Sequence, residues 1–133
     1  MESLELKVFS IKNDRKRKGK LKTAFNNVNE ILDLSNSCLT TISLPSIFSE
    51  HPMLKTLLLS NNSLSQAMII PKHDLVEVIS LARNNIRSIN IEKPLSCLKE
   101  LNLSYNKLTD FELLHGVLPS LEILDISHNR IEK

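Results

Sequence analysis

Histidine, cysteine, serine and aspartate are the residues of this 133-residue chain that could act as metal ligands or as a nucleophile with its base. Both kinds of site need side chains that converge on one point. The two cysteines, Cys38 and Cys97, lie far apart in no metal-ligand spacing, and the serines and aspartates recur regularly without forming a single cluster. Only two glycines are present, which excludes a glycine-rich phosphate loop. The sequence therefore predicts no catalytic residue, no metal site and no cofactor. The four histidines, which share no common position, are His51, His73, His115 and His128.

A second chemically distinctive segment is a basic run near the N-terminus. Residues 1–22 hold eight Lys and Arg against three acidic residues, although the formal net charge of the chain is only +2. Such a run is commonly a solvated turn, but it also resembles a nuclear-import or polyanion-binding patch. We expect no membrane contact, because no amphipathic apolar helix accompanies the run and no apolar stretch approaches the roughly 18–20 residues of a membrane helix. The candidate polyanion-binding residues are Arg15, Lys16, Arg17 and Lys18.

An internal repeat determines which elements would position any site. Five segments superimpose without gaps and share the pattern L-x-x-L-x-L-x-x-N-x-L, in which positions 4 and 6 are apolar. Their period of two places both side chains on one face of a strand. Since a single strand cannot bury that face, successive copies must stack into a continuous aliphatic column. The segments start at Asn29, Leu54, Val76, Leu98 and Leu121.

Position 9 of the repeat is the second regular feature. Here the chain leaves the strand, and backbone groups that lose their ladder partners can be satisfied by a buried carboxamide. The first copy has Ser37 instead, which is shorter, so we expect a looser first turn or a first coil partly specialised as a cap. The other four copies carry Asn62, Asn84, Asn106 and Asn129.

This pattern closely resembles the leucine-rich repeat family over about residues 29–131. The resemblance implies an α/β fold, a solenoid in the form of a right-handed superhelix with a parallel β-sheet on its concave face. We expect an N-terminal β cap with a basic turn at residues 1–28, then five repeats of the intracellular type at residues 29–133, the last incomplete. The segments between the strands predict a short helix in 45–53, extended chain in 65–74 and 87–97, and a short helix in 110–118 with Asp110 as its N-cap.

The concave face is the candidate site. Positions 3, 5, 7 and 8 of each repeat would be exposed there, which places Arg83 and Tyr105, residue types common in interface hot spots, on this face. Apolar residues such as Val78 and Ile123 are unusual on a solvated sheet and suggest a partly apolar docking patch. The candidate partner-binding residues are Thr56, Leu58, Val78, Arg83, Glu100, Asn102, Tyr105 and Asp125.

The sequence thus predicts a non-enzymatic protein–protein interaction module. One alternative is a targeting domain within a larger enzyme or bacterial effector, since the fifth copy reaches Lys133 without a convex segment or cap; another is a nuclear or RNA-associated adaptor that uses the basic run. The uncapped last strand would also permit self-association. The lack of an apolar leader and the low cysteine content predict an intracellular location, cytoplasmic or nuclear.

Overall fold

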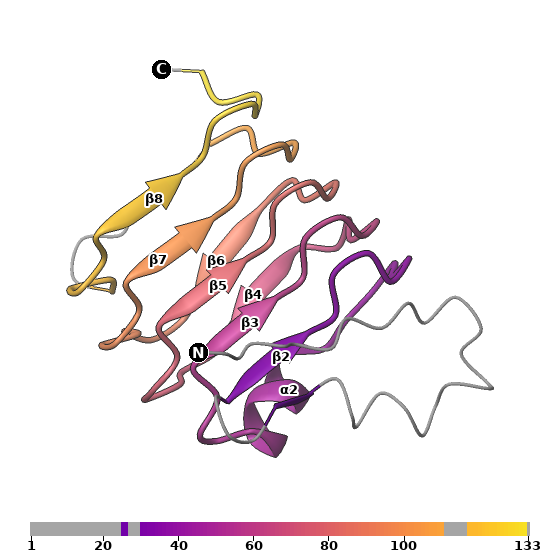
Figure 1. Ribbon diagram of the computed structural model, residues 1–133. Helices are drawn as coiled ribbons and strands as arrows, with labels where there is room; N and C mark the ends of the chain where they lie inside the picture. The colour runs from indigo at the N-terminus through magenta and orange to yellow at the C-terminus, as the bar shows by residue number, and fades with distance from the viewer. Residues whose placement is uncertain (1–24, 27–29, 111–116, 133) are drawn as a thin grey trace.

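The computed structural model describes residues 25–26, 30–110 and 117–132. Its main element is a six-stranded sheet in the order β1-β2-β3-β5-β7-β8 (Figure 1). Neighbouring strands from β2 to β8 run parallel, and β1 pairs antiparallel with β2. The strands of this long sheet are β1 (Phe25–Asn26), β2 (Ile31–Asp33), β3 (Thr56–Leu58), β5 (Val78–Ser80), β7 (Glu100–Asn102) and β8 (Ile123–Asp125).

The strand register confirms the predicted stacking of the repeat. Leu57 pairs with Ile79, and Ile79 pairs with Leu101, so equivalent positions of successive coils lie side by side. All three side chains are fully buried. Each coil therefore buries its apolar strand face only because the next coil lies beside it, which is how a solenoid is held together. The fold is the parallel-strand solenoid that the repeat pattern implied.

The core is aliphatic, as the repeat pattern predicted. Phe48 is the one aromatic residue in the cluster of buried side chains in the described part of the chain. Burial weakens at β8, where Leu124 is 37% exposed and Ile126 is half-buried. Leu124 occupies the same repeat position as the fully buried Leu101, so the difference reflects packing on one side instead of two.

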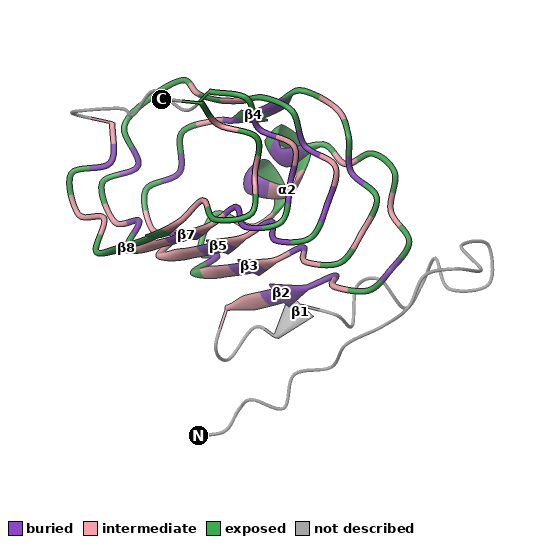
Figure 2. Cartoon of the chain, turned by 90° about the horizontal axis from the view of Figure 1, so that it is seen from above, coloured by how far each residue is buried: buried purple, intermediate pink, exposed green. Residues whose placement is uncertain are grey.

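The opposite side of the solenoid carries a helix and a second sheet (Figure 2). Helix α2 (Leu44–Glu50) begins at Ser43, whose side chain accepts a hydrogen bond from the Ser46 N–H, and proline occupies its first turn. Strands β4 (Met68–Ile70) and β6 (Ile89–Ile91) pair in parallel. The short helix and the two extended segments were predicted. Their pairing into a sheet was not.

Several predictions fall outside the described residues. These are the basic run Arg15–Lys18, most of the proposed N-terminal cap with its boundary at residue 28, and most of the helix expected in residues 110–118. Only β1 is described from the cap region.

Candidate binding face of the long sheet

Asparagine side chains fix the backbone where each strand ends. The Asn84 Oδ1 accepts a hydrogen bond from the Leu64 N–H at 3.0 Å. Its Nδ2 donates to the Leu59 and Leu81 carbonyls, both at 3.0 Å. One buried carboxamide thus ties a coil to the coil before it and closes its own turn. Equivalent bonds are made by Asn62, Asn106 and Asn129.

The first turn is not loose, contrary to the expectation from Ser37. Ser37 is 1% exposed, and its N–H donates to the Asn62 Oδ1 at 3.0 Å. The same oxygen accepts from the Leu39 N–H at 2.9 Å. The asparagine of the second coil therefore satisfies backbone groups of the first, so the shorter serine leaves no gap.

Position 8, which precedes the asparagine, has a left-handed backbone in every coil. The φ angles of Arg83, Tyr105 and His128 are 60°, 59° and 57°, and those of Asn36 and Asn61 are 57° and 58°. Asparagine tolerates this conformation, whereas for most other residues with a Cβ it is unfavourable in free energy. Residues held in such conformations cluster at functional sites. All five side chains are exposed at the ends of the strands.

Three of these side chains form a stack across neighbouring coils, which we call the position-8 stack. The Arg83 guanidinium carbon lies 4.0 Å from the centroid of the Tyr105 ring. The Tyr105 and His128 ring centroids are 4.1 Å apart, and the two planes differ by 7°. Because β7 lies between β5 and β8, Tyr105 is sandwiched between the other two. An exposed cation–π contact contributes about 0.5–1 kcal/mol, enough to restrict these side chains.

The remaining candidate residues lie in two columns beside this stack. Strand pairing aligns Thr56 with Val78 and Val78 with Glu100 at position 3. At position 5, Leu58 pairs with Ser80, Ser80 with Asn102, and Asn102 with Asp125. The strand register therefore places six of the eight candidate residues on one face of the long sheet, and Arg83 and Tyr105 follow the ends of β5 and β7. Thr56, Leu58, Val78, Glu100, Asn102 and Asp125 are half-buried, while Arg83 and Tyr105 are exposed.

The expected apolar patch is smaller than the sequence suggested. Leu58 and Val78 are half-buried, whereas Ile123 is well exposed, at 53%. Side chains on neighbouring strands shield those in the middle of the sheet. The alternation of residues along one strand predicts which face a side chain lies on, but not how far its neighbours cover it.

Two position-5 side chains are each oriented by the serine two residues later in the chain. The Asn102 Oδ1 accepts from the Ser104 N–H at 2.9 Å and from its hydroxyl at 2.7 Å. The Asp125 Oδ1 accepts from the Ser127 hydroxyl at 2.6 Å and from its N–H at 3.0 Å. These bonds lower the pKa of Asp125 below its usual value, and His128 adds a smaller effect in the same direction. Polar groups on this face are thus fixed without a partner.

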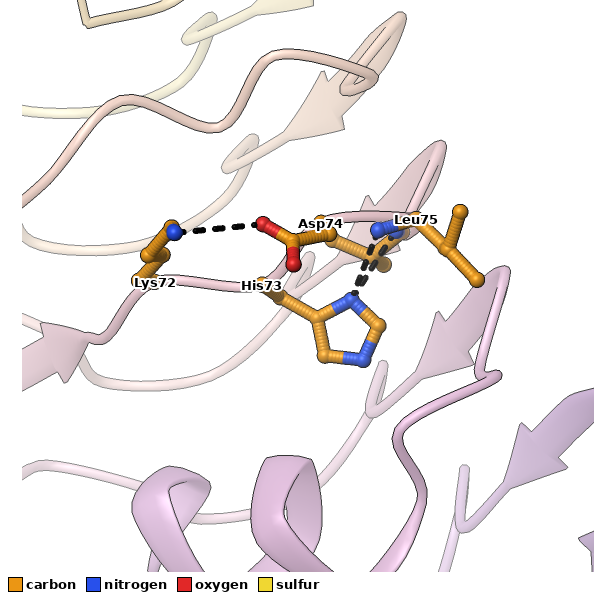
Figure 3. A network of polar contacts seen from close by, with 5 residues as sticks. Lys72, His73, Asp74 and Leu75 are labelled. Atoms are coloured by element: carbon orange, nitrogen blue, oxygen red, sulfur yellow. Dashed lines mark hydrogen bonds and ion pairs between the residues drawn. The ribbon is translucent and has the colours of Figure 1, made fainter.

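The side chain of His73, on the opposite side of the solenoid, is held by hydrogen bonds to backbone groups (Figure 3). Its Nδ1 accepts hydrogen bonds from the Val76 and Leu75 N–H groups at 3.0 and 3.2 Å. Since Nδ1 accepts, the proton lies on Nε2, which donates to the His51 carbonyl at 3.0 Å. The ring also meets Phe48 edge-on, with centroids 4.7 Å apart. His73 therefore fixes a turn. Burial lowers the pKa of the nearby His51, against a smaller opposing effect of Glu50.

Within the described ranges, no three histidine, cysteine or acidic side chains lie close enough together to hold a metal ion. The same residues include no helix that is long and apolar enough to cross a membrane. His128 was not among the predicted contact residues, although it shares position 8 with Arg83 and Tyr105. That shared position was the available signal.

Comparison with known proteins agrees with the repeat and the fold. A family model described as "Leucine Rich repeats (2 copies)" matches residues 98–133. The chain contains leucine-rich repeats. Osteomodulin of Mus musculus is 29% identical to this leucine-rich-repeat chain over 111 residues, which make up 79% of the chain and 23% of osteomodulin. The chain thus spans less than a quarter of that curated relative. No solved structure matches it. Leucine-rich-repeat domains are typically protein–protein interaction modules.

Proposed function

We propose that this leucine-rich-repeat chain is a non-enzymatic module that binds a protein partner on the concave face, formed by the long sheet. The observation that carries the proposal is the position-8 stack, in which exposed Arg83 and Tyr105 side chains are held in place on strained backbone. The contact residues are Thr56, Leu58, Val78, Arg83, Glu100, Asn102, Tyr105 and Asp125.

Rigidity supports this function. Each immobilised side chain costs about 0.5–1.5 kcal/mol on binding when it is free beforehand. Here Asn102 and Asp125 are already held by hydrogen bonds from the serines two residues later. Arg83 and Tyr105 are already stacked. These side chains have therefore already lost much of their conformational entropy on folding, so that a partner loses less affinity to ordering them.

The test is a measured dissociation constant for an isolated partner. The partner is first identified by cross-linking in a cell extract and then purified. Arg83→Ala combined with Tyr105→Ala is expected to weaken binding at least about 30-fold, since a hot-spot residue contributes about 2 kcal/mol or more. The matched control is Lys72→Ala with Asp74→Ala, an exposed ion pair on the opposite side of the solenoid. Equal affinity of the wild type and the Arg83/Tyr105 variant, with the fold intact by circular dichroism, would disprove the proposal.

We also place the chain inside the cell. Both cysteines are free thiols and Cys38 is exposed, which suits a reducing compartment. Fluorescence microscopy of the tagged, natively expressed protein tests this location, and secretion into the medium would contradict it.

Self-association through β8 remains a second prediction. Ile123 and Leu124 on this strand are 53% and 37% exposed. An unpaired strand edge with apolar side chains favours pairing with a second copy. Sedimentation velocity at increasing concentration should show a dimer, and a monomer at every concentration would refute it.

A further inference from the structure

Basic residues gather where the strands of the long sheet end. Positions 8 to 12 of the five coils contain four Lys or Arg residues and one acidic residue, Glu132. Position 2, at the other end of the strands, instead alternates Glu and Lys. Backbone hydrogen bonds from Lys107 to Ile86 and from Arg130 to Leu108 place these cations on successive coils. We call this set the basic edge; its residues are Arg83, Arg87, Lys107 and Arg130.

These cations are available to a partner. Arg83, Arg87 and Arg130 are exposed, and Lys107 is half-buried. In the described part of the chain, none of the four forms an ion pair, in contrast to Lys72 with Asp74. Because none of the four is paired with an acidic side chain among the described residues, these cations favour an anionic partner and steer its approach.

The position-8 stack determines what kind of anion fits this edge. Guanidinium N–H donors lie in the plane of the group, so a guanidinium held over the Tyr105 ring can still make a bidentate contact with a carboxylate. Proteins that bind single-stranded nucleic acid offer open aromatic faces to bases. Both faces of Tyr105 are instead covered, by Arg83 and by His128. The arrangement thus offers hydrogen-bond donors at its edges more than surfaces for base stacking.

We propose that the basic edge, with Arg83 held on the position-8 stack, binds an acidic segment of a protein partner. This inference rests on the proposed function and specifies the chemistry of the partner. A carboxylate binds the Arg83 guanidinium, and further acidic side chains of the same segment lie along Lys107 and Arg130. The strained backbone of Arg83, Tyr105 and His128 fits this role, since asparagine at the same position in the first two coils forms the same turn without a stack.

The experiment uses the full chain with Arg15, Lys16, Arg17 and Lys18 replaced by glutamine, so that the separate basic run contributes nothing. The probe is a fluorescein-labelled oligoglutamate peptide, compared with a labelled oligothymidylate of equal charge by fluorescence polarisation. We expect the peptide to bind more tightly than the oligonucleotide, with an affinity that falls as salt rises. Arg83→Gln should weaken peptide binding by about tenfold, or about 1.4 kcal/mol. Lys99→Gln, at the other end of the strands, is the charge-matched control and should leave affinity unchanged.

A second variant separates an organised site from diffuse charge. Tyr105→Asn removes the stack without changing any charge and retains a residue that tolerates a positive φ. It should weaken peptide binding several-fold. The inference is overturned if the peptide does not bind, if Arg83→Gln and Lys99→Gln have equal effects, if Tyr105→Asn binds like the wild type, or if the oligothymidylate binds as tightly as the peptide. The two proposals can fail separately. If the Arg83/Tyr105 double variant no longer binds the isolated protein partner, but the peptide does not bind the chain at all, the proposed function stands and this inference is refuted.

Discussion

Replacing Asn84 by alanine tests the physical basis of the solenoid. The side chain makes one bond as an acceptor, from the Leu64 N–H, and donates to the Leu59 and Leu81 carbonyls. The Leu59 and Leu81 carbonyls keep a second donor, because the Asn62 and Asn106 side chains also donate to them. The Ala82 carbonyl, which the Asn84 Nδ2 also reaches at 3.2 Å, keeps the Asn61 N–H as its donor. Only the buried Leu64 N–H is therefore left without any partner.

The expected loss follows from that difference. An orphaned buried donor costs about 1–3 kcal/mol, and each of the two lost carbonyl bonds costs about 0.5–1.5 kcal/mol. Asn84→Ala should thus lower the free energy of unfolding by about 2–6 kcal/mol, a large part of the 5–15 kcal/mol typical of a domain. Asn84→Asp should be no better, because its carboxylate would face two carbonyl oxygens in a buried site.

The assay is urea unfolding followed by far-ultraviolet circular dichroism. Asn85→Ala is the matched control, since that neighbouring side chain is half-buried and its change should stay within about 0.5 kcal/mol. The account of the asparagine column is refuted if Asn84→Ala costs no more than Asn85→Ala.

Three further predictions concern packing, a structural histidine and a carboxyl pKa. Leu57→Ala should cost about 2–5 kcal/mol in urea unfolding because Leu57 is fully buried, and the same change at the partly exposed Leu124 should cost clearly less; equal losses would contradict the stacked column. His73→Leu should lower stability by about 2–4 kcal/mol, because it orphans buried amide donors, and a neutral outcome in thermal unfolding would rule out the structural role. Ser127→Ala should raise the pKa of Asp125 toward its usual value in an NMR titration. Because the native pKa is lowered, the stabilisation by Asp125 is present above the unfolded-state pKa and is lost as the pH falls through the native one; an unchanged pKa would show that the serine bonds are not its cause.

The solenoid and its asparagine column could be predicted because their signals repeat. Leu57, Ile79 and Leu101 recur in phase, and only side-by-side stacking can bury all of them. The demand for buried hydrogen bonds likewise explains an asparagine such as Asn84 at each turn. Neither inference needs the distances between coils.

The position-8 stack could not be predicted in full, because it depends on backbone angles and coil spacing. Asn36 and Asn61 hinted at a left-handed backbone at this position. Nothing in the sequence states that Arg83, Tyr105 and His128 stand close enough to stack. The pairing of β4 with β6 escaped prediction for a similar reason, since it depends on how the convex segments are aligned by the coils.

The central claim is that a partner lies on the concave face, formed by the long sheet, and site-specific photo-cross-linking tests it most directly. A photo-reactive benzoylphenylalanine is introduced in place of Asn102, in the middle of this face, or in place of Ile69, which is 44% exposed on the opposite side. The account predicts a cross-link to the purified partner from position 102 and none from position 69. A cross-link from position 69 alone would contradict it.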